Sequence, residues 1–155
     1  MKKIHLRLVI VLLLIGSIAG SYSFWRDTSA ASRRTAYSGG SDLLARIIQA
    51  EAGAEPYLGQ VAVGAVILNR IQSAKFPKTI AGVVYQPHAF ESVSNGQFNK
   101  PPTDSARKAA HAALGGWDPS GGALFFYNPS KVLSPTSYVW TRRIIQKIGK
   151  HFFAR

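Results

Sequence analysis

The chain has 155 residues, of which 46% are hydrophobic and 17% charged, so it can bury a core and global disorder is excluded. Lys and Arg number 19 against seven Asp and Glu, a formal net charge of +12 that favours polyanionic partners such as nucleic acid, anionic lipid or an acidic cell-wall polymer. Cysteine is absent, which excludes disulfide frameworks, thiol catalysis and cysteine-ligated metals. No internal repeat is visible, which excludes solenoids and propellers.

The first 25 residues have the pattern of an export segment. Three basic residues in Met1–Arg7 precede Leu8–Ile18, an uncharged, mostly apolar stretch of 11 residues. Ser17 and Ala19 offer the small residues that a signal peptidase reads. Extended to Trp25, the apolar run also fits a short membrane anchor, so signal peptide and retained anchor both stay open. In either case we expect the rest of the chain to be extracytoplasmic: secreted, wall-associated or anchored.

A linker and a folded unit are predicted after this segment. Residues 26–40 are small, polar and basic and end in Gly-Gly, a composition typical of flexible linkers. The folded unit then covers residues 41–155. It holds 13 Lys and Arg against six Asp and Glu, so its own net charge is +7 and the basicity is not confined to the leader.

Three helices are predicted in the first two thirds of the folded unit. The first begins with Ser41 as its N-cap and ends at Gly53. The second, residues 57–74, has small or apolar side chains nearly all round and should be the buried central helix. The third covers residues 104–114, and Thr103 caps it.

The remaining segments are shorter. Residues 79–85 are ambiguous, and residues 86–102 read as a loop. Residues 123–127 form an aromatic strand candidate, and residues 138–148 and 151–153 could complete a small antiparallel sheet. Helices first and a small sheet last predict an α+β fold.

Glu51 is the strongest candidate for a general acid. It closes a helix whose Leu44, Ile47 and Ile48 face the core, so its carboxyl should be partly desolvated. Desolvation raises a carboxyl pKa, and the negative end of the helix dipole acts in the same direction. The alternative interpretation is a solvent-facing glutamate at a helix end.

The other titratable groups carry weaker signals. Glu55 directly precedes Pro56, and two interpretations are open: it caps the central helix, or it is a second acid in the same cleft. His88 and Glu91 form a His-x-x-Glu pair whose spacing is weak, so a loop surface is the favoured interpretation. His111 and His151 have no partners at metal-ligand spacing. We therefore predict no metal site and no cofactor, and a calcium requirement cannot be read from the sequence.

The second half of the chain is rich in aromatic and amide side chains. Rings stack on sugar faces and amides bond hydroxyl and acetamido groups, whereas each ring taken singly also suits a core. The predicted substrate-binding residues are Tyr85, Gln86, Gln97, Phe98, Tyr127, Asn128 and Trp140.

Taken in order, several segments resemble the spore cortex-lytic cell-wall hydrolases of the SleB/CwlJ group. The resemblance covers residues 41–153 and rests on EAGAEPY (51–57), GQVAV (59–63), VILNR (66–70), FP (76–77), TIAGVVYQ (79–86), QF (97–98), DPSGGA (118–123), YNP (127–129) and IGKHFF (148–153).

This resemblance implies a mostly helical domain, similar to lysozymes and lytic transglycosylases, with a small C-terminal antiparallel sheet. It implies cleavage of peptidoglycan glycan strands in spore germination or wall remodelling. The family's catalytic glutamate falls on Glu51 and its second motif glutamate on Glu55. Two departures concern the local charge: Ala54 stands where Arg is common, and Tyr127 where relatives frequently carry His. The layout matches neither the long members, with their N-terminal peptidoglycan-binding domain, nor the short members, which typically lack an export leader.

A single acid favours a lytic transglycosylase mechanism. Protonated Glu51 would protonate the glycosidic oxygen between N-acetylmuramic acid and N-acetylglucosamine, and its carboxylate would then deprotonate the muramic 6-hydroxyl as that oxygen closes on C1. Attack by water, as in a muramidase, is the alternative and needs the same acid. An amidase would need zinc and histidine ligands that the sequence does not offer.

Two non-enzymatic classes compete with this prediction. One is a basic module that binds the cell wall without catalysis. The other is a nucleic-acid binder, which the export leader and the absence of a concentrated Lys/Arg helix argue against. The expected partners are therefore peptidoglycan glycan strands, with an accessory spore-coat or membrane protein as a further candidate, and not nucleic acid.

Overall fold

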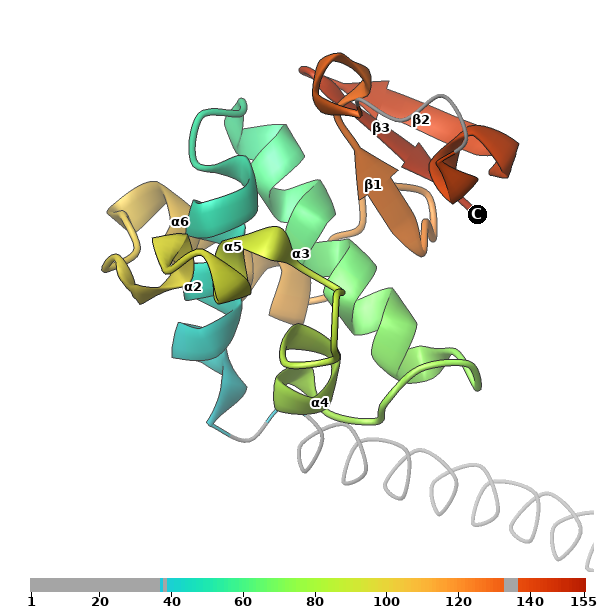
Figure 1. Cartoon of the computed structure of the whole chain (residues 1–155). Helices are drawn as coiled ribbons and strands as arrows, with labels where there is room; N and C mark the ends of the chain where they lie inside the picture. The colour runs from blue at the N-terminus through green and yellow to red at the C-terminus, as the bar shows by residue number, and fades with distance from the viewer. Residues whose placement is uncertain (1–36, 38, 133–136) are drawn as a thin grey trace, which may run out of the picture. The chain divides into compact units, whose positions relative to one another are not determined.

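The computed structural model describes residues 37, 39–132 and 137–155, which belong to one compact unit, residues 36–155 (Figure 1). The predicted signal peptide or anchor and nearly all of the predicted linker lie outside these residues, so those predictions remain predictions. Within the described part of the chain, no helix is long and apolar enough to cross a membrane.

The fold is α+β and mostly helical, with a small antiparallel sheet formed by the C-terminal part of the chain, as predicted. Its elements in chain order are α2 (Gly40–Ala52), α3 (Tyr57–Gln72), α4 (Ile80–Val84), α5 (Glu91–Ser94), the 3₁₀ helix η1 (Gln97–Asn99), α6 (Asp104–Leu114), β1 (Phe125–Tyr127), η2 (Pro129–Lys131), η3 (Tyr138–Thr141), β2 (Ile144–Ile148) and β3 (His151–Ala154).

Helix α3 is the buried centre of the helical layer. Twelve of its 16 residues are buried, in agreement with its nearly uniform apolar sequence. A Cβ atom at Gly64 would lie 2.8 Å from Cδ1 of Ile48 in α2 and 3.1 Å from Cβ of Ala113 in α6. Glycine therefore lets α2 and α6 approach α3 closely from two sides.

Two helix ends differ from the prediction. Helix α2 begins at Gly40 and not after Ser41, because Gly39 adopts a left-handed conformation (φ 69°) and is the N-cap. The folded unit also starts earlier than residue 41, since Tyr37 packs on the core and its phenol oxygen accepts a hydrogen bond from Gln72 Nε2 (3.0 Å). Helix α3 ends at Gln72, two residues before the predicted end, because Ser73 is extended (ψ 135°).

Short helical turns form where the sequence indicated an ambiguous segment and a loop. Thr79 caps α4 by accepting a hydrogen bond from the Gly82 N–H (3.0 Å), and Thr103 caps α6 as predicted. Between them, Phe90 and Phe98 are buried in the helical core. These two rings hold α5 and η1 on the body of the protein, so the predicted loop is folded on the core.

The sheet has strand order β1-β3-β2, with β3 pairing antiparallel to both neighbours. Only residues 144–148 of the predicted strand 138–148 join it, because residues 138–141 form a 3₁₀ helix with local hydrogen bonds. Residues 123 and 124 precede β1, although the Leu124 N–H still donates to the Ala154 carbonyl oxygen of β3 (3.0 Å).

The connection between helices and sheet is built on Asp118, for which the sequence predicted only a turn. Its carboxylate accepts hydrogen bonds from Asn69 Nδ2 of α3 (2.9 Å), from the N–H and O–H of Ser120 (2.8 and 2.5 Å) and from the Gly122 N–H (2.8 Å). Burial alone would raise the pKa of Asp118, but these hydrogen bonds outweigh it and hold the pKa below its ordinary value.

Arg70 makes the second tie between α3 and the sheet. Its Nε donates to the Leu124 carbonyl oxygen (2.8 Å), directly before β1. The guanidinium carbon lies 5.3 Å from the ring centroid of Phe76, 5.3 Å from that of Phe90 and 5.8 Å from that of Phe125. Burial lowers the pKa of Arg70, and these aromatic faces supply a favourable surrounding for its charge.

Asp118→Ala should lower the free energy of unfolding by about 2 kcal/mol, because it leaves Asn69 and two backbone N–H groups without their charged acceptor. Asp42→Ala is the matched control, since Asp42 is an exposed carboxylate whose partners within the described residues are Arg46 and Arg107 at the surface. Urea unfolding of both variants measures the difference. An equal loss in the two variants would contradict the structural role assigned to Asp118.

Candidate functional site

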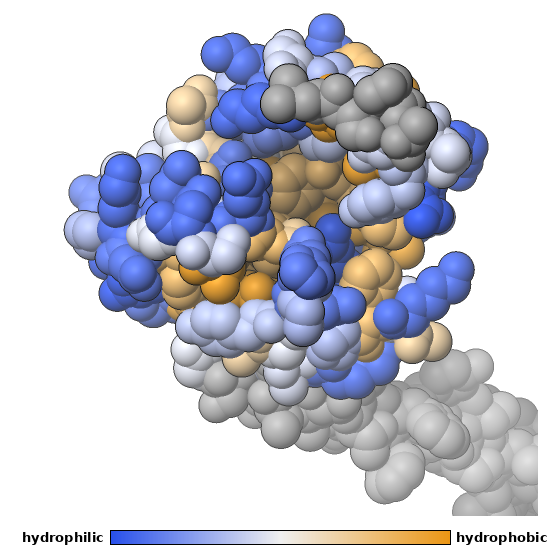
Figure 2. Space-filling view, viewed as in Figure 1, coloured by the Kyte–Doolittle hydropathy of each residue, from blue (hydrophilic) through white to orange (hydrophobic). Residues whose placement is uncertain are grey.

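A cavity of about 230 Å³ lies between the helices and the sheet, and we call it the Glu51 cavity. Figure 2 shows this face of the molecule hollowed, with apolar surface inside and hydrophilic side chains around the opening. Helices and the adjoining segment supply Ala50, Glu51, Glu91, Ser92, Asn95 and Gln97. The sheet and the residues that follow β1 supply Phe126, Tyr127, Asn128, Lys131, Val132 and His151.

Glu51 lies in the last turn of α2, at the helix end nearest the negative pole of its dipole. Ile47 and Ile48, one turn earlier on the same face of α2, are fully buried and fix this end of the helix in the core. The carboxyl is thereby held at the cavity wall and largely withdrawn from solvent. The predicted desolvation of Glu51 is confirmed, since burial raises the pKa of its carboxyl above the ordinary value.

Ser92 makes the direct contact with the acid. Its hydroxyl donates a hydrogen bond to Oε1 of Glu51, across 41 residues of sequence. This bond, the charge of Lys131 and the backbone N–H of Ser92 act against burial by lowering the pKa of Glu51, while the nearby charge of Glu91 acts with burial by raising it. Burial outweighs the opposing contributions, so the pKa of Glu51 remains raised.

His151 is a buried polar side chain on the sheet side of the cavity. Its ring makes edge-to-face contacts with Phe126 (centroids 5.4 Å apart) and Phe153 (6.3 Å). Among the described residues, its Nδ1 is the only buried side-chain nitrogen or oxygen without a hydrogen-bond partner. Burial lowers the pKa of His151, which favours the neutral imidazole.

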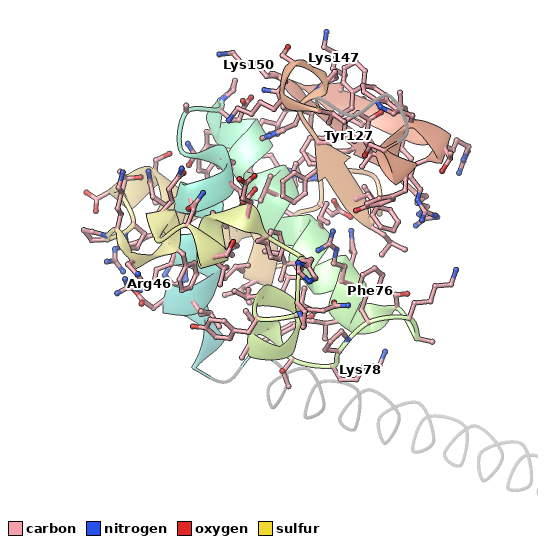
Figure 3. The ribbon with its side chains drawn as sticks, viewed as in Figure 1. Arg46, Phe76, Lys78, Tyr127, Lys147 and Lys150 are labelled. Carbon is pink, nitrogen blue, oxygen red and sulfur yellow. The ribbon has the colours of Figure 1, made fainter. Side chains whose placement is uncertain are left out.

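Four of the predicted substrate-binding residues gather at this side of the protein. Gln97, Tyr127 and Asn128 line the Glu51 cavity. The ring of Trp140 packs edge-on against Tyr127, with centroids 5.6 Å apart, and so backs the cavity wall. In Figure 3, Tyr127 lies in the sheet lobe, whereas Lys147 and Lys150 lie at the upper edge of that lobe in this view.

The other three predicted residues lie elsewhere. Tyr85 and Gln86 line a second cavity of about 400 Å³, together with Pro87, His88, Phe90, Glu91, Val93 and Ser94. Glu91 belongs to both cavities, so the second cavity adjoins the first. Phe98 is only 8% exposed and packs in the helical core with its ring edge-on to Tyr85, because a loop that must lie on the core needs an apolar anchor.

Glu55 is a structural tie and does not line the Glu51 cavity. Pro56 is the N-cap of α3, and no side chain caps that helix, so the predicted capping role of Glu55 is wrong. Instead, Oε2 of Glu55 accepts a hydrogen bond from the Lys150 N–H (2.9 Å) in the turn between β2 and β3. A Cβ at Gly149 (φ 57°) would lie 2.2 Å from that oxygen, so only glycine admits this contact.

Sequence reasoning missed several residues of the cavity: Ser92, Asn95, Phe126, Lys131 and Val132. Their spacing in the sequence does not indicate a site, because only the tertiary fold brings them to the cavity that Glu51 lines. Glu91 was interpreted as loop surface; it is indeed exposed, but it also faces the cavity. Among the described residues, no cluster of three or more His, Cys, Asp or Glu side chains could hold a metal ion.

Comparison with known proteins agrees with this architecture. The family model described as Cell Wall Hydrolase matches residues 54–154, beginning three residues after Glu51. The chain therefore belongs to the cell wall hydrolase family, in its SleB/CwlJ group.

Two kinds of curated relative represent that group. The spore cortex-lytic enzyme of Bacillus cereus is 50% identical over 113 residues, which cover 73% of this chain and 43% of the relative. The cell wall hydrolase CwlJ of Bacillus subtilis is 38% identical over 95 residues, covering 57% of this chain and 66% of the relative. The chain thus spans less than half the length of the spore cortex-lytic relative.

Solved structures show the same fold. The catalytic domain of the Bacillus cereus SleB protein superposes with a TM-score of 0.68 at 49% identity, covering 74% of this chain and 88% of the relative. The catalytic domain of SleB from Bacillus anthracis gives 0.70 at 47% identity, with 76% and 95% covered.

Glu51→Gln should make the protein more stable at neutral pH, since it removes a carboxylate that burial disfavours and keeps an oxygen that can accept the Ser92 hydrogen bond. Because the folded state binds the Glu51 proton more tightly than the unfolded chain, stability of the native protein falls as pH rises from the ordinary value of 4.5 through the raised pKa. The two proteins should therefore melt alike near pH 4, and the variant should melt higher at pH 8.

Thermal unfolding at pH 4 and pH 8 measures this difference. Asp104→Asn is the matched control, because Asp104 is an exposed carboxylate at the start of α6 and should gain no stability at pH 8 when neutralised. A Glu51→Gln variant that is no more stable than the native protein at pH 8 would contradict the raised pKa.

Proposed function

We propose that this chain cleaves the glycan strands of peptidoglycan, in the spore cortex or the cell wall, as a lytic transglycosylase in which Glu51 is the acid and base. The observation that carries the proposal is a half-buried carboxyl of raised pKa on the wall of a cavity lined by aromatic and amide side chains. The printed names of the relatives support it, since they include spore cortex-lytic enzymes and a SleB domain described as a germination-specific lytic transglycosylase.

The raised pKa suits Glu51 to the first step. The protonated carboxyl donates its proton to the glycosidic oxygen between N-acetylmuramic acid and N-acetylglucosamine. The bond between C1 and that oxygen breaks, and its electron pair stays on the leaving oxygen. Gln97, Tyr127 and Asn128 line the same cavity and are proposed to hold the sugar by stacking and by amide hydrogen bonds.

The second step uses the carboxylate that remains. The muramic 6-hydroxyl oxygen forms a bond to C1, and its proton passes to Glu51, which restores the acid. The product is a 1,6-anhydro sugar, and no second carboxylate takes part. Such an intramolecular attack gains its rate from orientation, so the shape of the cavity matters more than further acid–base groups.

A water-using hydrolase of the same bond is the second candidate, and Glu91 is the observation that favours it. Glu91 is an exposed carboxylate on the same cavity as Glu51. In an inverting hydrolase, one carboxyl protonates the leaving oxygen while another activates water. Glu91→Gln separates the two mechanisms, because a transglycosylase does not need that carboxylate whereas an inverting hydrolase does.

The second cavity is proposed to bind the glycan strand beyond the bond that is cleaved. Tyr85 is 57% exposed and presents a ring for stacking, and Gln86 adds an amide beside it. Because Glu91 borders both cavities, a strand that crosses α5 would contact both. We therefore propose a substrate-binding role for Tyr85 and Gln86, and not for the buried Phe98.

Glu51→Gln should lower the rate of glycan cleavage by about two to four orders of magnitude, the range typical for loss of a general acid. Glu55→Gln should leave the rate nearly unchanged, because glutamine keeps an oxygen that can accept the Lys150 N–H. Glu55→Ala should instead lower stability by about 1 kcal/mol. Release of soluble fragments from purified cortex and from vegetative sacculi measures the rates. A larger loss of rate in Glu55→Gln than in Glu51→Gln would mean that Glu55, and not Glu51, is the acid.

Glycan acetylated on the muramic 6-oxygen should resist cleavage, and chemical deacetylation should restore it, because the acetylated oxygen has no proton to give and cannot close on C1. Mass spectra of the released fragments should show anhydro ends from the deacetylated strands. A water-using hydrolase would give reducing ends, and rapid cleavage of acetylated strands with such ends would replace the transglycosylase proposal with the muramidase.

A further inference from the structure

Ser92 is the residue in direct contact with the proposed acid, and neither the sequence motifs nor the comparisons assign it a role. It is 5% exposed, and its hydroxyl donates to Oε1 of Glu51. When a buried hydroxyl donates to a half-buried carboxylate, the bond both fixes the orientation of the carboxylate and stabilises its charge.

The short helix that carries Ser92 is held firmly. Phe90, immediately before α5, is buried and stacks on Phe126 of β1 with ring centroids 6.3 Å apart. Phe98, four residues after α5, is also buried in the helical core. Ser92 is therefore fixed from both sides, and its hydroxyl is presented to Glu51 by a segment that is anchored in the core and on β1.

The contact distinguishes the two oxygens of the Glu51 carboxyl. Oε1 accepts the Ser92 hydroxyl, and the Ser92 backbone N–H has a smaller effect on the same carboxyl, whereas no side-chain hydrogen bond to Oε2 is found among the described residues. Within the same residues, the only side-chain oxygen or nitrogen that is both buried and unpartnered is His151 Nδ1, so Oε2 is open to the cavity that Glu51 lines.

We propose that Ser92 is a positioning residue, which holds Oε1 of Glu51 so that Oε2 gives the proton to the glycosidic oxygen and takes it back from the 6-hydroxyl. This inference rests on the proposed function of Glu51. Ser92 itself touches neither sugar nor reacting atoms in this scheme; it acts through the carboxyl that it holds.

The charged and titratable groups around Glu51 act at longer range. They come from each neighbouring element: Glu91 of α5, Lys131 of η2, Arg70 of α3 and His151 of β3. No ion pair with Glu51 is found among the described residues, where the ion pairs are those of Asp42. Ser92 is thus the local contact through which the carboxylate is stabilised at short range.

Ser92→Ala should change the pH profile of cleavage. Removing a hydrogen bond to the carboxylate favours the protonated acid, so the alkaline limb of kcat/KM should move up by about one pH unit. The rate at the optimum should fall about tenfold, because the carboxyl is no longer oriented. Ser92→Cys, a nearly isosteric weak donor, should give an intermediate shift, and Ser92→Thr should restore the native profile.

Ser105→Ala is the matched control. It also removes a serine hydroxyl that donates to an oxygen, Oε1 of Gln60 (2.9 Å), but on α6 and outside both cavities. Its profile should keep the native alkaline limb. A purely structural role for Ser92 would lower the rate at every pH without moving the limb, and that result would overturn the inference.

A carboxyl-carbon NMR titration of Glu51 in the native chain and in Ser92→Ala, without substrate, tests the same contact independently of activity. The Glu51 pKa should rise in the variant. If Glu51→Gln remains active, the proposed function fails, and the titration still reports on Ser92. If Glu51→Gln is inactive while Ser92→Ala leaves both profile and titration unchanged, only the positioning role is wrong.

Discussion

The position of the sheet relative to α3 is the constraint on which the candidate site depends. Asn69 and Arg70, adjacent near the end of that helix, hold the segment from Asp118 to Leu124 that leads into β1. At the other end of the helix, Glu55 holds the turn between β2 and β3. The Glu51 cavity takes one wall from the helices and the other from this sheet, so its width is set by hydrogen bonds that lie outside it.

Basic side chains lie on the surface of the sheet lobe, whereas the cation Arg70 and the acid Glu51 are largely withdrawn from solvent. Residues 119–155 contain six Lys and Arg and no Asp or Glu, and Lys147 and Lys150 lie at the upper edge of the sheet lobe in Figure 3. Burial acts differently on the buried Arg70 and the half-buried Glu51. Arg70 keeps its charge among three phenylalanine rings, whereas Glu51 has a raised pKa and so tends toward the neutral acid. Because burial raises the pKa of Glu51, its ionised form costs stability at neutral pH.

Local patterns predicted the helices well and the segments between them poorly. Thr103 and Gly115 bound α6 in the structure as in the sequence, because caps and glycine ends act on the nearest backbone groups. Residues 86–102 carry no periodicity, yet Phe90 and Phe98 fold them onto the core, since burial of two rings outweighs the absence of a local signal. For the same reason Phe98, predicted to bind substrate, is in the core.

The sequence by itself determined the α+β order of elements, the buried central helix and the special status of Glu51, whose place at the end of an apolar helix face already predicted desolvation. The segments resembling cell wall hydrolases were also visible in the sequence. Only the tertiary structure decided which side chains surround that acid, because Ser92, Glu91, Lys131 and His151 are 40 to 100 residues away along the chain. It also turned Glu55 from a presumed cap into a tie to the hairpin. Periodicity records which face of a helix is buried, but it does not record what another part of the chain places against that face.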